Sequence, residues 1–165
     1  MPTIGKPKID TRPKQTYMGI RTITPFKGMS RRIAQLSDEM NAWMTEHNLK
    51  PSGPPFLRYH VIDMRGFMDI EYAFPVRKAL PDDGEVKAGV LPAGRYASLI
   101  YSGGGISGNR ALIEWVRAQG LDFDRWDTEQ GDNFRGRYET YLTDPKVEPR
   151  KSKWQIEVAI KLAEA

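Results

Sequence analysis

The order of expected elements repeats along the chain, and this repeat limits the possible folds more than any single motif. A strand, a helix and two further strands are expected over roughly residues 14–80, and again over roughly residues 84–163. Each βαββ module would pack its helix on one face of an antiparallel sheet. The sequence therefore predicts an α+β fold, a pseudo-twofold repeat of two βαββ modules with a ligand cleft at their junction. A single open sheet without a groove is the alternative.

In the first module, residues 16–23 form a β-branched and aromatic run between two prolines, which is typical of a strand. A helix is expected next, because apolar side chains recur at helical spacing; they are Met29, Ile33, Leu36, Met40 and Trp43. Ser30 is expected to cap this helix, and the segment 48–51 to end it. Strands are expected at residues 56–62 and 69–76.

The second module is predicted to have its strands at residues 85–91, 94–101, 137–143 and 154–162. A glycine-rich loop at residues 102–108 leads into a helix that ends at Gly120; its apolar residues are Ala111, Leu112, Trp115 and Val116. Ser107 or Asn109 is expected to cap this helix. A polar loop is expected to run through Trp126 and Gly131.

The composition fits one domain over residues 1–165 and excludes several functions. The absence of cysteine excludes disulfides, thiol catalysis and cysteine-bound metals. The net charge of +4 comes from scattered basic residues, so no direct DNA binding is expected. The sequence has no apolar run of membrane-spanning length and no secretory signal at its start, so a cytoplasmic location without membrane association is expected.

The loop Gly103–Gly108 fits the G-x-G-x-x-G pattern of dinucleotide sites. No apolar parallel strand precedes the acids at Asp122 and Asp124, so the loop is interpreted as a flexible turn whose helix-start amides could contact an anionic group. The two histidines, His47 and His60, have no acidic pair at metal spacing. The sequence predicts no metal site and no cofactor.

Glu139 is the main candidate for a functional residue, because it lies in the middle of a strand pattern rich in tyrosine and threonine. Alternation puts Arg137, Glu139 and Tyr141 on one face of this strand, and aromatic residues lie on both faces. Glu139 could be solvated, or it could pair with Arg137 or with Arg58 across the strands.

The functional interpretation of Glu139 is a carboxylate in an aromatic cleft. There it would attract a cation, or act as a general base if burial raised its pKa. The aromatic candidates for the cleft are Tyr59, Tyr72, Tyr101, Trp126, Phe134 and Tyr141.

Four segments, taken in their order, resemble the gyrase-inhibitor-like (GyrI-like) family, which includes effector-binding domains of bacterial multidrug-sensing regulators. They are DIEYAFPV (69–76), LPAGRYASLIYSGG (91–104), IEWVRAQGL (113–121) and RYETYLTDP (137–145). The resemblance implies two βαββ modules with a ligand cleft between them. It also implies that Glu139, with Tyr141 beside it, meets cationic ligands there. The last strand lacks the Ile-Pro pair of many members, and no helix-turn-helix segment precedes the first strand.

Three functions follow from these observations. The first is a stand-alone binding protein for amphipathic, aromatic or cationic small molecules. The second is a hydrolase of strained electrophiles, such as cyclopropane-containing toxins, with Glu139 as catalytic residue and Tyr72 or Tyr141 as the second polar group. The third is an interaction module of the gyrase-inhibitor kind, whose partner would be another protein.

Overall fold

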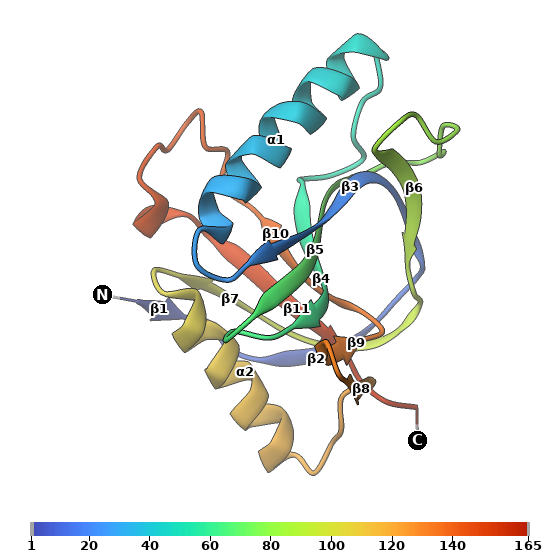
Figure 1. The fold of residues 1–165 in the computed structure, drawn as a ribbon. Helices are drawn as coiled ribbons and strands as arrows, with labels where there is room; N and C mark the ends of the chain where they lie inside the picture. The colour runs from blue at the N-terminus through green and yellow to red at the C-terminus, as the bar shows by residue number, and fades with distance from the viewer. Residues whose placement is uncertain (1, 165) are drawn as a thin grey trace.

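Eleven strands in one antiparallel sheet and two α-helices make up the fold of residues 2–164, which the computed structural model describes (Figure 1). The helices are α1 (Met29–Glu46) and α2 (Gly105–Ala118), and a 3-10 turn spans Lys151–Lys153. The strands are β1 (Thr3–Ile4), β2 (Lys8–Arg12), β3 (Gln15–Pro25), β4 (Phe56–Ile62), β5 (Phe67–Pro75), β6 (Val86–Leu91), β7 (Gly94–Ser102), β8 (Arg125–Thr128), β9 (Gly131–Phe134), β10 (Arg137–Tyr141) and β11 (Ile156–Lys161). The expected α+β class is confirmed. Within residues 2–164, no helix is long and apolar enough to cross a membrane.

The strand order has the antiparallel pair β10·β4 at its middle. It runs β1-β7-β11-β10-β4-β5-β3-β6, with β2 paired to β7 and with the β8–β9 hairpin attached to β4. One half of the sheet contains β4, β5 and β3, and helix α1 connects β3 to β4. The other half contains β10, β11 and β7, and helix α2 lies between β7 and β10 in the chain. The twofold relation between these two groups stays a prediction.

The sheet curls strongly, because two strands that follow each other in the chain lie near opposite ends of the sheet. Only Pro92 and Ala93 connect β6, at one end of the sheet, to β7, near the other end. Three Cα–Cα steps reach at most about 11 Å, so these two strand ends must approach each other. The guanidinium of Arg58 on β4 also donates to Val90 O on β6, with an Nη1–O distance of 2.9 Å.

The helices lie on one face of this sheet, over two separate cores. The first core joins α1 to β3, β4 and β5; it includes Leu36, Met40, Met18, Leu57 and Ile70. The second joins α2 to β7 and β11; it includes Leu112, Val116, Leu99, Val158 and Ile160. The opposite face of the sheet is the inside of the curl, where Tyr17, Phe56 and Leu91 are buried with Tyr138 packed against them. Each helix therefore covers its own part of the sheet, and Ile62, which lies between them, packs against both cores.

Both predicted helix caps are wrong. Helix α1 begins after Gly28, which has a left-handed backbone (φ 91°), and no side chain caps it. Helix α2 begins at Gly105, inside the segment predicted as a loop, so Ser107 and Asn109 are helical residues. The predicted end at Gly120 is confirmed, since it follows the helix with φ 72°.

Two pairs of strands were not expected from the sequence. Strands β1 and β2 extend the sheet along β7, although no strand was predicted before residue 16. Strands β8 and β9 form a hairpin where a polar loop was predicted. Every residue of β8 is exposed, so the alternation of apolar and polar residues that marks a half-buried strand is missing there.

Candidate functional site

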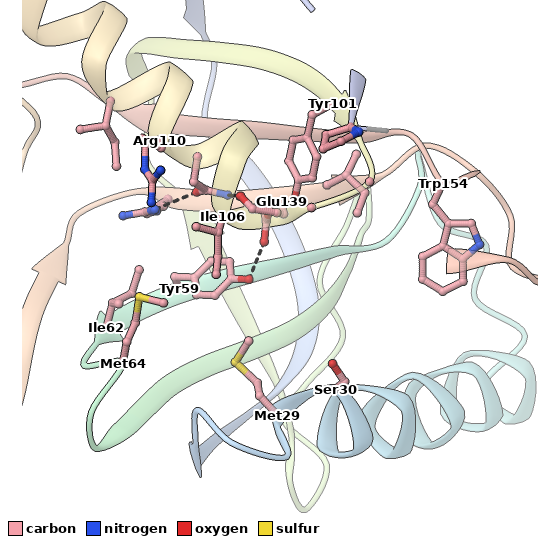
Figure 2. A pocket seen from close by; sticks show the side chains of 18 of the residues that line it. Met29, Ser30, Tyr59, Ile62, Met64, Tyr101, Ile106, Arg110, Glu139 and Trp154 are labelled. Carbon is pink, nitrogen blue, oxygen red and sulfur yellow. Dashed lines mark hydrogen bonds between the residues drawn. The ribbon is translucent and has the colours of Figure 1, made fainter. Parts of the chain in front are cut away.

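A cavity of about 1100 Å³ lies between the N-terminal end of α1 and one face of α2, over the middle of the sheet (Figure 2). Its lining residues come from both helices, from β4, β5, β7, β10 and β11, and from the loops next to them. The apolar and aromatic ones are Phe26, Met29, Tyr59, Ile62, Met64, Met68, Tyr101, Ile106, Ile113, Tyr141, Trp154 and Ile156. The charged ones are Arg110, Glu114, Arg117, Arg137, Glu139, Lys151 and Lys153. The cavity thus combines an apolar and aromatic lining with several charged side chains, and small-molecule sites likewise combine apolar walls with placed polar groups.

Glu139 lies in this cavity with 8% of its surface exposed, and three side chains donate hydrogen bonds to it. The Tyr59 hydroxyl donates to Oε1 and the Tyr101 hydroxyl to Oε2. Asn109 Nδ2 also donates to Oε2, at 3.3 Å. The donors come from β4, β7 and α2, so four elements of the fold converge on one carboxylate (Figure 2).

Local features of β4 and α2 shape the surroundings of the two tyrosines that donate to Glu139. The register of β4 against β5 shifts between Tyr59 and Val61, and as a result Tyr59 and Ile62 both line the cavity although three positions separate them. The Tyr101 ring packs under α2 at Gly108, where an added Cβ would lie 2.5 Å from the ring. A glycine is therefore required at position 108 for the helix to approach Tyr101 this closely.

The tyrosine hydroxyls of the cavity keep their protons throughout the neutral range. Burial raises the pKa of Tyr101, and the charge of Glu139 and the hydrogen bond to it raise this pKa further. Burial and the charge of Glu139 also raise the pKa values of Tyr59 and Tyr141 well above the ordinary value. Tyr59 and Tyr101 are thus fixed as donors to Glu139. Among the described residues, the Tyr141 hydroxyl forms no hydrogen bond.

Neither arginine expected as a partner of Glu139 forms an ion pair with it among the described residues. Arg137 Nη2 donates instead to Asn109 Oδ1, at 2.8 Å, so that Asn109 bridges the guanidinium and the carboxylate. Arg58 lies on the opposite face of the sheet, where its Nη1 donates to the Tyr17 hydroxyl at 3.0 Å. The solvated interpretation is wrong as well, since Glu139 is buried.

Four of the seven residues predicted for the site line the cavity, and three do not. Tyr59, Tyr101, Glu139 and Tyr141 line it, which identifies the face of β10 that the sequence left open. Their ligand-binding role stays a prediction.

Tyr72, Phe134 and Trp126 lie outside the cavity lining. Tyr72 is buried in the core under α1, with its ring centroid 6.2 Å from that of Tyr141. Phe134 is buried in the core under α2. Trp126 is 41% exposed on β8 and carries the guanidinium of Arg135 on its ring.

Sequence reasoning missed Asn109 and Arg137 as site residues. Asn109 was expected to cap a helix, but α2 begins four residues earlier. Arg137 was considered only as a partner for Glu139. Strand alternation puts the two residues on the same face, and this pattern indicates that Arg137 faces the cleft as well.

A second buried polar network occupies the other face of the sheet. The Tyr17 hydroxyl donates to Glu71 Oε1 at 2.6 Å, and His60 Nε2 lies 2.8 Å from the same oxygen. Burial alone would raise the pKa of Glu71, but the hydrogen bonds from His60 and Tyr17 and the charge of Arg58 bring it below the ordinary value. His47, the other histidine, stacks on Trp43 at the end of α1. Between residues 2 and 164, no group of three His, Cys, Asp or Glu side chains could hold a metal ion.

A curled antiparallel sheet with a cavity between two helices defines a class of ligand-binding α+β domain, and the sequence agrees with this class. A family model described as the GyrI-like small molecule binding domain matches residues 5–163. The chain belongs to this GyrI-like family. No curated protein matches the chain.

Solved structures of low sequence identity share the fold. The EcmrR C-terminal domain is 18% identical with a TM-score of 0.68, covering 98% of this chain and 99% of that domain. In the EcmrR–DNA complex the TM-score is 0.74 and the identity 18%, over 97% of this chain. This chain spans only 58% of that EcmrR chain.

Two further structures have names that bear on function. The protein SAV2435 bound to tetraphenylphosphonium is 12% identical, with a TM-score of 0.58, covering 96% of this chain and 94% of that one. A hydrolase from Listeria innocua is 12% identical, with a TM-score of 0.63, covering 96% of this chain and 92% of that one. At these identities the likeness concerns the fold.

Proposed function

We propose that this chain binds amphipathic, aromatic cations, and that Glu139 is the residue that selects positive charge. The observation that carries the proposal is a carboxylate with 8% exposure inside a cavity of largely apolar and aromatic lining. A charge removed from water acts on its surroundings with little dielectric screening, so it favours a ligand of opposite charge. The faces of the surrounding aromatic rings add attraction for a cation.

The hydrogen bonds to Glu139 indicate which kind of cation suits the site. The two carboxylate oxygens already accept from Tyr59, Tyr101 and Asn109. A ligand with its own N–H donors would have to compete with them, whereas a delocalised cation without donors interacts through charge alone. Phosphonium and quaternary ammonium compounds with aryl groups therefore fit this environment.

The size and flexibility of the cavity suit ligands with several rings. Its volume of about 1100 Å³ is at the upper end of small-molecule sites. Met29, Met64 and Met68 contribute to the lining, and methionine side chains adapt readily to ligands of different shape. The family description supports a small-molecule ligand, and the tetraphenylphosphonium bound by SAV2435 supports this class of ligand.

The proposal is tested with two ions of nearly identical shape and opposite charge, tetraphenylphosphonium and tetraphenylborate. Isothermal titration of the protein with each ion gives the two dissociation constants. We expect the phosphonium to bind at least about tenfold more tightly, which corresponds to about 1.4 kcal/mol. Equal affinities, or tighter binding of the borate, would contradict a site that selects cations.

A hydrolase is the second candidate, and the fold neighbour from Listeria innocua that is named a hydrolase favours it. For this function Tyr141 is the better second polar group, because it lines the cavity while Tyr72 does not. The three donors on Glu139 count against it as a general base, because few of its lone pairs remain free. Incubation with a cyclopropane-containing electrophile, followed by product analysis, distinguishes turnover from binding. A protein partner, as in the gyrase-inhibitor type of module, remains the third candidate.

A further inference from the structure

Arg137 is a buried charge in the cavity, and its Nε is a buried donor without an acceptor. The residue is 9% exposed, lines the cavity, and places its guanidinium over the Phe134 ring at 4.6 Å. A guanidinium has five N–H donors. Among the described residues, the acceptor recorded for them is Asn109 Oδ1, and Arg137 Nε has none.

This arrangement is unfavourable unless a further acceptor reaches the guanidinium. A buried charge with an unsatisfied donor is unfavourable in general, which is why such groups are usually fully paired. Burial lowers the pKa of Arg137, but an arginine side chain stays protonated at neutral pH. Glu139 does not pair with it directly, because Asn109 lies between them.

The charges around the cavity also differ from those of a simple cation site. Five lining residues are basic, namely Arg110, Arg117, Arg137, Lys151 and Lys153, and two are acidic, Glu114 and Glu139. Arg137 and Glu139 are buried, whereas the other charged residues of the lining are exposed. This exposed part is predominantly basic, because Glu114 is its one acidic residue among those named. This exposed part of the lining attracts an anionic group, which a ligand can carry in addition to a cationic centre at Glu139.

We propose that Arg137 forms an acceptor-binding subsite beside Glu139, and that the preferred ligands are amphipathic zwitterions. This inference rests on the proposed function, because it assigns the cationic part of the ligand to Glu139 and adds a carboxylate or similar anionic group at Arg137. Residues two positions apart on one strand face are separated by about 7 Å, which sets the spacing of the two ligand charges. The aromatic part of the ligand lies toward Tyr141 and Trp154, whose rings pack against each other in the cavity lining.

Two matched phosphonium compounds test this inference, carboxybutyl-triphenylphosphonium and pentyl-triphenylphosphonium. They share the cation and differ in the carboxylate, which an extended butyl chain carries about as far from the phosphorus as the strand spacing requires. Isothermal titration of the wild-type protein should give about tenfold tighter binding for the carboxylate compound. This measurement needs no variant.

Variants then assign the preference to Arg137. Arg137→Gln keeps a side-chain donor for Asn109 and should abolish the preference while the pentyl compound still binds. Glu139→Gln should weaken both compounds and keep the preference. Lys87→Gln removes one exposed positive charge on β6, outside the cavity, and should change neither affinity.

The outcomes separate this inference from the proposed function. If both compounds bind the wild-type protein equally, or if the preference survives in Arg137→Gln, the subsite at Arg137 is refuted while the cation site stands. If neither compound binds, the proposed function fails and the subsite fails with it. A preference that disappears only in Arg137→Gln establishes the subsite.

Discussion

The hydroxyl of Tyr101 donates a hydrogen bond to Glu139 Oε2 from a strand that is not its neighbour in the sheet. Strand β11 lies between β7 and β10, and Val158 is the residue paired with Glu139. The tyrosine side chain reaches diagonally over this intervening strand, beneath helix α2. The carboxylate of the candidate site is thus held by the packing of a helix on the sheet as well as by its own strand.

Replacing Tyr101 with phenylalanine should lower the free energy of unfolding by about 1.5–3 kcal/mol, because Glu139 loses a buried donor. Urea denaturation of both proteins measures the difference. Tyr141→Phe is the matched control: the Tyr141 hydroxyl forms no hydrogen bond among the described residues, so little change is expected. Equal effects of the two substitutions would show that the hydrogen bond from Tyr101 to Glu139 does not contribute to the free energy of unfolding.

Gly108→Ala tests the contact between α2 and Tyr101. Alanine should stabilise a helix by about 1 kcal/mol over glycine, but overpacking typically costs about 1–3 kcal/mol. Since the added Cβ would lie 2.5 Å from the Tyr101 ring, we expect steric repulsion to win. The variant should have a lower melting temperature and weaker affinity for tetraphenylphosphonium. In the control Gly53→Ala, where the nearest atom is 3.5 Å away, both should stay close to wild type.

Ligand binding should be visible in the fluorescence of Trp154. This residue lines the cavity, whereas Trp126 is exposed on β8 outside it. We expect tetraphenylphosphonium to change the tryptophan emission of the wild-type protein, and Trp154→Phe to remove most of that change. Trp126→Phe should leave it intact. If Trp126→Phe removes the change and Trp154→Phe does not, the ligand binds at the β8–β9 hairpin instead.

Glu71 should make stability depend on pH in the acid range. Its pKa is below the ordinary value in the folded protein, so the unfolded chain binds its proton more readily. The resulting stabilisation is fully present above the unfolded pKa of about 4.3 and is lost as the pH falls through the folded pKa. Urea denaturation between about pH 6 and about pH 3 should show this loss, and Glu71→Gln should reduce the slope. Glu39→Gln, an exposed change on α1, should keep the wild-type slope.

The sequence predicted the elements with regular patterns and missed those without them. Helix α1 and strands β3 to β5 carry clear apolar periodicity, and they lie close to where they were expected. The β8–β9 hairpin has no such periodicity, and β2 is a short, mostly polar segment without a recognisable strand pattern. These strands form because they complete the hydrogen bonding of neighbouring strands, which a local pattern does not reveal.

The site was predictable in part for a similar reason. Strand alternation, together with the family resemblance, pointed to Glu139 and Tyr141. Tyr59 and Tyr101 were two of six aromatic candidates, and only the three-dimensional arrangement separates them from Trp126. Asn109 was missed because its place depends on the first turn of α2, which three glycines made difficult to locate.

The most direct test of the account compares Glu139→Gln with the wild-type protein in titrations with tetraphenylphosphonium and tetraphenylborate. Removing the buried charge should lower the affinity for the phosphonium by roughly 10–100-fold and raise the affinity for the borate. The two ions have nearly the same shape and opposite charge, so opposite effects report on charge alone. Glu114→Gln, which removes an exposed carboxylate from the cavity lining, should have little effect on either ion. If Glu139→Gln changes both affinities in the same direction, or changes neither, Glu139 does not select the charge of the ligand.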